Sequence, residues 1–424
     1  MNQQIYLPRI IDKAVERHLR TFGAVCIEGA KWCGKTRTAI VHSNSSLYLG
    51  DPSGNFQNKS LAKLDPTLVL EGDPPRLLDE WQEVTELWDA VRFEVDRRGK
   101  KGQFILTGSA TPAQKGVLHS GAGRIATLRM RPMSLYESKD SSGQISFEDI
   151  CNETYKNSAT EEVKLERLIK LIIRGGWPGS LDVETSEYTL IAKEYLNAII
   201  NHDLYRLEGI NRNTRKMNLL LKSLARNEST TVSMNTLRRD IKEHEEEDLD
   251  NDTISSYLTL FERMFLIENL KAFSSNIRSS VRLKQSDKRH FVDPSLACAL
   301  LSATQEMLIG DLNTLGFLFE ALSERDLRIY AESFNAHLFH YQDYDGDEID
   351  AVVELENGDW VAIEIKLGSH QIDEAAKTLI RIKNKIINGG GKPPKVLCVI
   401  CGLCKAAYLR DDGVYVVPIT ALKH

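Results

Sequence analysis

The feature that most constrains the fold is a glycine-rich segment near the amino terminus. The stretch Gly29-Ala30-Lys31-Trp32-Cys33-Gly34-Lys35-Thr36 satisfies the pattern G-x-x-x-x-G-K-[ST]. It follows a short apolar run at residues 24–27, typical of a strand, and precedes a helical pattern at residues 38–41. A strand, a loop of this kind and a helix together predict an α/β domain that binds a nucleoside triphosphate.

Each part of this loop has an expected task. The backbone N–H groups of residues 29–36 surround the phosphates, and the glycines allow the backbone to approach closely. Lys35 is expected to reach the β- and γ-phosphates, and the Thr36 hydroxyl is expected to ligate Mg²⁺. The sequence therefore predicts ATP and Mg²⁺ as cofactors.

A second strand is expected at residues 76–80, where the apolar run ends in Asp79 and Glu80. In a nucleotide-hydrolysing site Asp79 would hold Mg²⁺ through water, and Glu80 would polarise the attacking water. The alternative is that the two acids only cap a turn. The phosphate loop favours the catalytic interpretation.

A third strand, residues 104–106, ends in Thr107-Gly108-Ser109, and Thr107 is the expected sensor of the γ-phosphate. Arg124 follows in a glycine-rich turn. An arginine at the phosphates stabilises transition-state charge, either within one chain or from a neighbouring subunit of a homo-oligomer. A surface arginine without catalytic duty is an equal alternative.

Several motifs together resemble a prokaryotic family of AAA-type ATPases whose C-terminal half is a domain of unknown function similar to restriction endonucleases. The resemblance spans nearly the whole chain. It implies an AAA-type ATP-binding domain. The Trp32-Cys33 pair departs from the smaller or polar residues that the family usually has in the phosphate loop, and this departure concerns the affinity for ATP rather than the function. The matching segments are Leu7-Pro8-Arg9, the phosphate loop, Leu78-Asp79-Glu80-Trp81-Gln82, Leu106-Thr107-Gly108-Ser109, Ala122-Gly123-Arg124, Arg131-Pro132-Met133-Ser134, Arg174-Gly175-Gly176-Trp177-Pro178-Gly179 and Val292-Asp293-Pro294.

The length of 424 residues is enough for two to four domains, and we expect three: a P-loop AAA-type ATPase domain at 1–140, a helical and winged-helix-like domain at 158–290, and a restriction-endonuclease-like α/β domain at 291–424. The polar, irregular stretch 140–157 suggests the first boundary. No run approaches the ~20 apolar residues of a membrane helix. Seven cysteines in so long a chain indicate a reducing compartment, so a cytoplasmic protein without a membrane partner is expected.

The middle of the chain has the layout of a winged helix-turn-helix. Helical patterns at residues 234–242 and 252–266 precede a strand-like stretch at 266–273, and the family is interpreted in the same way. The second helix carries only Arg263 as a base and follows an acidic run, which is poor composition for a DNA groove. Packing or lid duty is favoured over DNA contact.

A basic run covers residues 271–290 in a chain whose net charge is −6. Such a run is usually a solvated surface, yet it is the best candidate here for contact with the phosphates of DNA or RNA. Its basic residues are Lys271, Arg278, Arg282, Lys284, Lys288 and Arg289.

Two alternating strands are expected at residues 348–355 and 360–367, joined by a turn at 357–359. Asp350 followed by Glu364-x-Lys366 matches the D…E-x-K signature of restriction-endonuclease-like nucleases, in which two acids hold a divalent metal and a lysine activates water. A three-residue turn would place Asp350 opposite Lys366 and on the face of Glu364. Glu320 would add a further acid, as in the resembling nucleases. The alternative is a solvated sheet face.

Cys398, Cys401 and Cys404 have the spacing of iron–sulfur ligands, but no fourth cysteine lies nearby in the sequence. We expect them to be core residues of a buried strand at 396–400. Two functions follow from these patterns. One is an ATP-hydrolysing protein whose C-terminal domain recognises or cuts nucleic acid; the other is a nucleotide-gated switch whose nuclease-like fold only binds a partner.

Overall fold

The computed structural model describes residues 6–110, 119–203, 213–245, 247–274 and 286–424. The chain divides into two compact units at Pro132–Met133, and the first unit also takes in Thr259–Leu266. The second unit contains both Met133–Asn201 and Ile267–His424. The three expected domains, with boundaries at 140–158 and 290–291, stay a prediction.

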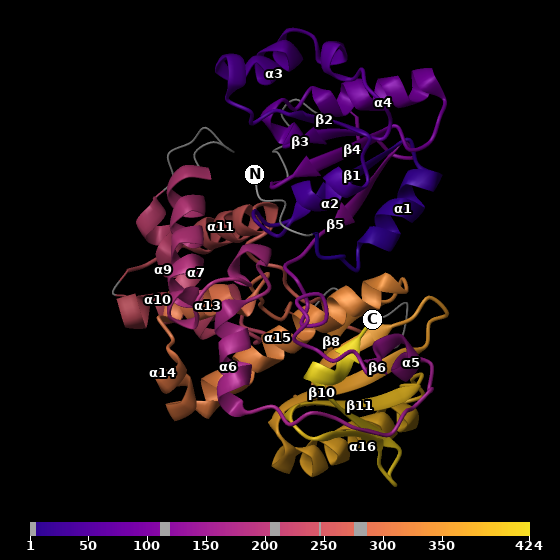
Figure 1. Ribbon diagram of the computed structural model, residues 1–424. Coiled ribbons are helices and arrows are strands. Elements are labelled where there is room, and N and C mark those ends of the chain that lie inside the picture. The colour runs from indigo at the N-terminus through magenta and orange to yellow at the C-terminus, as the bar shows by residue number, and fades with distance from the viewer. Residues whose placement is uncertain (1–5, 111–118, 204–212, 246, 275–285) are drawn as a thin grey trace. The chain divides into compact units, whose positions relative to one another are not determined.

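The first unit is built on a sheet of five parallel strands in the order β2-β3-β4-β1-β5 (Figure 1). Its strands are β1 (Ala24–Glu28), β2 (Ser45–Tyr48), β3 (Arg76–Asp79), β4 (Phe104–Gly108) and β5 (Ile125–Arg129). Its helices include α1 (Asp12–Thr21), α2 (Lys35–Val41), α3 (Ser53–Leu64) and α4 (Leu87–Arg98).

The order of the strands positions the nucleotide-binding residues. The central strands β1 and β4 are almost fully buried, and both read as continuous apolar runs, as parallel strands covered on both faces do. Strand β4 lies between β1 and β3. The carboxyl ends of the three strands are therefore neighbours at one edge, which is where ligands bind in open α/β sheets.

The second unit is mostly helical up to residue 333. The helices in its described part include α5 (Phe147–Cys151), α6 (Leu165–Arg174), α7 (Tyr188–Ala198), α9 (Thr214–Arg226), α10 (Met234–Glu245), α13 (Pro294–Leu301), α14 (Gln305–Gly310) and α15 (Leu312–Ser333). Helix α11 (Asn251–Arg263) follows α10. In place of the expected strand at 266–273 the structure has isolated bridges, which pair Ile267 with Phe291 and Leu270 with Lys288. A further bridge pairs Thr230 with Arg289.

A seven-stranded sheet forms the rest of the second unit, in the order β7-β12-β13-β11-β10-β9-β8. Helices α15 and α16 pack on opposite faces of its central strands (Figure 1). The strands are β7 (Ser158–Ala159), β8 (His337–Gln342), β9 (Glu348–Glu354), β10 (Trp360–Gly368), β11 (Val396–Leu403), β12 (Ala406–Leu409) and β13 (Val414–Pro418); α16 is Ile372–Asn388, and a separate pair joins β6 (Ile145–Ser146) to β14 (Leu422–Lys423).

The β9–β10 hairpin has a register that differs from the expected one. Ala351 pairs with Ile363, so that the same register brings Asp350 opposite Glu364 rather than Lys366. The turn lies one residue earlier than predicted, because Leu355 N–H donates to the Asp359 carbonyl and leaves three residues between them. This moves the pairing by two residues, which leaves every side chain on its predicted face.

The expected buried strand at 396–400 is confirmed as part of β11, and Cys398, Cys401 and Cys404 are buried free thiols. Within the described ranges, none of the helices combines the length and the apolar character needed to cross a membrane.

Candidate functional site

The phosphate loop has the shape that its sequence predicts. Gly34 adopts a φ of +107° and caps the start of α2, so the helix begins at Lys35. The Lys35 side chain is buried, and its ammonium group donates to the carbonyl of Ala30 at 2.8 Å. The ammonium therefore lies within the curve of the loop, at the positive end of a helix.

Arg9 holds this loop from outside, a role that the sequence analysis did not assign. Its guanidinium group donates to the carbonyls of Cys33 and Arg131, each at 2.8 Å. Gly29 is needed because a Cβ there would lie 2.0 Å from the Met130 carbonyl oxygen. In the sequence Arg9 stands out only as part of the family resemblance, and nothing in its spacing points to the loop.

Asp79 is the centre of a hydrogen-bonded set at the strand ends. Its Oδ1 accepts from the Thr36 hydroxyl at 2.8 Å and from the Thr107 hydroxyl at 2.7 Å. Burial raises the pKa of Asp79, and these two hydrogen bonds oppose the rise. The structure thus brings together the three residues that the sequence expects around Mg²⁺ and the γ-phosphate.

Glu80 follows in the left-handed region, with a φ of +59°. Such a backbone is costly for a residue with a side chain and is concentrated at functional sites. The Glu80 N–H donates to Thr107 Oγ1 at 3.0 Å, and its carboxylate accepts from Ser109 Oγ at 2.8 Å and from the Gln82 amide. Ser109 and Gln82 therefore orient the carboxylate. Both lie in segments that carry the family resemblance, but the sequence alone does not predict that they contact Glu80.

Arg124 is not at the phosphate loop of its own chain. It directly precedes β5, and β5 pairs in parallel with β1 so that Ile125 lies beside Ala24. Arg124 is thus at the amino end of the sheet, whereas the loop follows the carboxyl end of β1, roughly 16 Å away along a five-residue strand. Its guanidinium group pairs with Asp96 at 2.9 Å in an exposed position. The alternative in which Arg124 acts within its own chain is therefore wrong.

The C-terminal acids and lysine also come together. Lys366 Nζ lies 3.0 Å from Asp350 Oδ2 and 2.6 Å from Glu364 Oε2. The same Asp350 oxygen accepts from the backbone N–H of Ile365 at 2.7 Å. Burial raises the pKa of Glu364 to about 8, and repulsion by Asp350 adds to the rise.

Lys288 is a second ammonium in this cluster, and it is not the surface cation that the basic run predicted. Its Nζ contacts Glu320, Glu324 at 2.9 Å and the Asp350 carbonyl at 3.1 Å, and its side chain is 8% exposed. The basic residues Arg278, Arg282 and Lys284 lie outside the described residues. Among the residues that the structure describes, no three His, Cys, Asp or Glu side chains form a group that could hold a metal ion.

His290 connects this cluster to Glu228. Its Nδ1 lies 3.1 Å from Glu228 Oε1, and its Nε2 lies 2.8 Å from Glu324 Oε2. Burial disfavours the imidazolium, but attraction to Glu324 and hydrogen bonds to both glutamates outweigh it and raise the pKa of His290 to about 9. A histidine whose pKa is raised on folding stabilises the folded state below its unfolded pKa, near 6.5.

We therefore expect the free energy of unfolding to fall as the pH rises from about 6.5 through about 9, because the proton of His290 is lost from the folded state. Urea unfolding measured across this range tests the expectation. The His290→Gln variant should lose part of the slope, whereas His337→Gln, at an exposed position of β8, should keep it. A wild-type stability that does not fall over this range contradicts the assignment.

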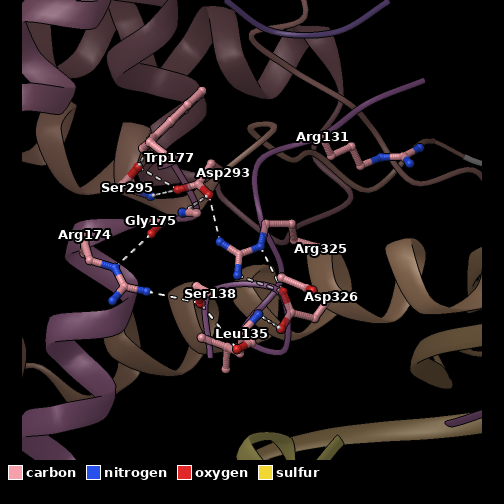
Figure 2. Close-up of polar contacts among 12 residues, drawn as sticks. Arg131, Leu135, Ser138, Arg174, Gly175, Trp177, Asp293, Ser295, Arg325 and Asp326 are labelled. Carbon is pink, nitrogen blue, oxygen red and sulfur yellow. Dashed lines mark hydrogen bonds and ion pairs between the residues drawn. The ribbon is translucent and has the colours of Figure 1, made fainter. Parts of the chain in front are cut away.

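Three segments at or directly beside those that carry the family resemblance meet in one buried network around Arg325 and Asp326 (Figure 2). Arg325 donates to Asp293 at 2.8 Å and to Asp326 at 2.7 Å, and the other oxygen of Asp326 accepts from the Leu135 N–H at 2.8 Å. Gly176 N–H donates to Asp293 at 2.9 Å. The network fixes residues 133–135, 174–177 and 293–295 onto α15.

Comparison with protein families divides the chain into three matching regions. Residues 21–139 match the family described as AAA domain. Residues 165–307 and 315–422 match two families, each described only as a domain of unknown function, DUF8612 and DUF4143. The first unit is thus an AAA-type, ATPase-like domain with a parallel sheet, within a mixed α/β protein.

Individual relatives are distant. The uncharacterized proteins Mb2031c of Mycobacterium bovis and Rv2008c of Mycobacterium tuberculosis are each 23% identical over 357 residues, which is 83% of this chain and 72% of the relative. Among solved structures, the Walker-type ATPase PABY2304 of Pyrococcus abyssi has a TM-score of 0.39 and 13% identity, covering 68% of this chain and 94% of its own. The replication initiator DnaA, bound to AMPPCP and single-stranded DNA, has a TM-score of 0.26 and 14% identity, covering 60% and 86%.

Proposed function

We propose that this protein binds ATP at the carboxyl ends of β1, β3 and β4 and hydrolyses it. The observation that carries the proposal is the hydrogen-bonded set in which Asp79 accepts from both Thr36 and Thr107, directly beside the phosphate loop. Backbone N–H groups of residues 29–36 bind the phosphates, with Gly29, Ala30, Lys31, Trp32, Cys33 and Gly34 forming the loop. Lys35 neutralises the β- and γ-phosphates.

The residues present fit Mg²⁺, because a hydroxyl and a carboxylate are the hard oxygen ligands that this ion prefers. Thr36 and Asp79 would hold it, and when bound it neutralises charge on the phosphate oxygens. Glu80 orients and deprotonates the attacking water, with its carboxylate fixed by Ser109 and Gln82. The Thr107 hydroxyl accepts from the Glu80 N–H and donates to the Asp79 carboxylate, and so holds the two acidic residues in position.

Arg124 would complete the site from a second copy of the chain, in a homo-oligomer. Arg124 lies at the amino end of the sheet, whereas the phosphate loop of the same chain lies at the carboxyl end. A catalytic Arg124 would therefore have to act on the ATP bound by another copy of the chain. The alternative is a structural ion pair with Asp96.

Titration of ATP into the protein tests the binding step. Wild type should bind tightly, and Lys35→Ala should bind too weakly to measure, because the ammonium within the loop is lost. Lys63→Ala, which removes an exposed lysine of α3, is the matched control and should bind as wild type does. Equal affinities for Lys35→Ala and wild type would contradict the proposed phosphate contact.

For the C-terminal domain we propose a restriction-endonuclease-like fold. The support is the order α15, β8, β9, β10, α16, β11, in which β9 carries Asp350 and β10 carries Glu364 and Lys366. A working nuclease site would hold a divalent metal between Asp350 and Glu364, with Glu320 as a further ligand. The alternative, a fold that only binds a partner, is favoured by the two ammonium groups that already engage these carboxylates.

For the middle region we propose a winged helix. The helices α9, α10 and α11 come first, and the bridges between residues 267 and 291 and between 270 and 288 follow α11 in the expected order. A third bridge pairs residue 230, between α9 and α10, with residue 289. DNA or RNA contact through residues 271–290 would then be made by the basic residues other than Lys288, which is buried among glutamates. Because α11 has few basic residues, we propose that it packs against the protein or serves as a lid and does not bind in a DNA groove.

A further inference from the structure

Lys288 comes from a part of the chain that its sequence marks as exposed. It lies at the end of the basic run, and an isolated bridge pairs it with Leu270. Yet its side chain is 8% exposed, and its ammonium group ends among acidic residues of α15 and β9. A lysine is rarely buried unless it is paired with an acidic group, so the contacts of Lys288 with these acids account for its burial.

The partners of Lys288 include one proposed metal ligand, the Glu320 carboxylate, and the main chain of another, Asp350. Lys288 contacts Glu320 and Glu324 of α15 and the carbonyl of Asp350. Lys366 engages the two remaining acids, Asp350 and Glu364. Each carboxylate of the proposed metal site therefore already has an ammonium partner.

Carboxyl groups outnumber the basic side chains in this cluster. Two ammonium groups and the His290 ring lie among five buried or nearly buried carboxyl groups, those of Glu228, Glu320, Glu324, Asp350 and Glu364. His340, which is 2% exposed, has an Nε2 without a hydrogen-bond partner among the described residues, and its electrostatic neighbours include Lys288 and Glu324. Carboxyl oxygens beside an imidazole nitrogen without a hydrogen-bond partner are the kinds of ligand that a divalent cation takes.

A divalent cation and the Lys288 ammonium exclude each other at this place. Both would need the Glu320 carboxylate, and the ammonium already occupies the main-chain carbonyl of Asp350, whose carboxylate would hold the metal. Two cations this close in a buried site repel strongly. We propose that Lys288 is an internal counter-ion that closes the carboxylate cluster to divalent cations, so that the C-terminal domain holds a metal only when Lys288 has withdrawn or is replaced. This regulation rests on the metal site proposed for Asp350, Glu364 and Glu320.

Titration calorimetry with Mn²⁺ on the full-length chain, without nucleotide, tests the proposal. Wild type should show no Mn²⁺ site that depends on Asp350. Lys288→Ala should gain one site, with at least a tenfold higher affinity than wild type, and adding Asp350→Asn should remove it. Arg289→Ala, which removes the neighbouring cation, is the matched control and should behave as wild type does.

Removing an ammonium from among carboxylates could prevent folding, so a second variant keeps the charge balance. Lys288→Met combined with Glu324→Gln removes one positive and one negative charge, and Mn²⁺ should raise its melting temperature but not that of wild type. If wild type binds Mn²⁺ in an Asp350-dependent manner, the metal site stands and the role of Lys288 is wrong. If neither Lys288 variant gains a site, the metal site itself is wrong. Neither outcome affects the ATPase proposal, which concerns the first unit.

Discussion

The Glu80→Gln variant is expected to bind ATP as wild type does and to hydrolyse it roughly 10²-fold more slowly or worse, because a general base contributes at least this much to catalysis. The amide keeps the size of the side chain and one oxygen for the Ser109 hydroxyl, so the fold and the phosphate loop are preserved. It cannot take a proton from water. Steady-state phosphate release, measured beside ATP titration, separates the two effects.

Glu83→Gln is the matched control for this experiment. Glu83 lies three residues further along and pairs with Lys59. Its loss should leave both ATP affinity and turnover close to wild type. A wild-type rate of hydrolysis in Glu80→Gln would show that another group activates the water, and the left-handed backbone at Glu80 would then need a different explanation.

Replacement of Arg325 by methionine should lower the free energy of unfolding by about 3–5 kcal/mol, the cost of breaking a buried ion pair by removing one partner. The reason is that Asp293 and Asp326, which are fully buried, would lose their shared counter-ion. Leu135, Gly176 and Ser295 would be left bound to carboxylates without compensation. Urea unfolding of the full chain, monitored in its second unit, measures the loss.

An exposed arginine pair of the same unit supplies the comparison. Arg381 contacts Asp347, and its side chain is 57% exposed. Exposed pairs contribute about 0–1 kcal/mol, so Arg381→Met should change stability by no more than this. A loss below about 1 kcal/mol in Arg325→Met as well would mean that the network in Figure 2 does not hold the three motifs onto α15.

The sequence was most informative where spacing alone determines geometry. The pattern from Gly29 to Thr36 requires a loop before a helix, and the structure begins α2 at Lys35. Asp79 and Thr107 were expected at the ends of strands, and parallel pairing of β3 with β4 brings them within hydrogen-bond distance. The faces of Asp350, Glu364 and Lys366 also followed from alternation, because a shift of two residues in register leaves them unchanged.

The sequence could not predict what depends on the order of strands in the sheet. Arg124 lies close to the other nucleotide-site motifs along the chain, but its strand runs parallel to β1 and places it at the opposite end. Lys288 looked exposed because its neighbours are polar, and only the tertiary fold supplies its glutamates from α15. The convergence of residues 133–135, 174–177 and 293–295 on Arg325 likewise joins segments that are far apart in the sequence.

The most direct test of the account is the release of phosphate from ATP by the wild-type chain, measured with Mg²⁺, with excess EDTA, and in the Lys35→Ala background. We predict steady turnover with Mg²⁺ that falls to the Lys35→Ala background when EDTA removes the metal, because Thr36, Asp79 and Glu80 are placed to act together beside the loop. Wild-type phosphate release that does not exceed the Lys35→Ala background in the presence of Mg²⁺, at ATP concentrations that saturate binding, would contradict it.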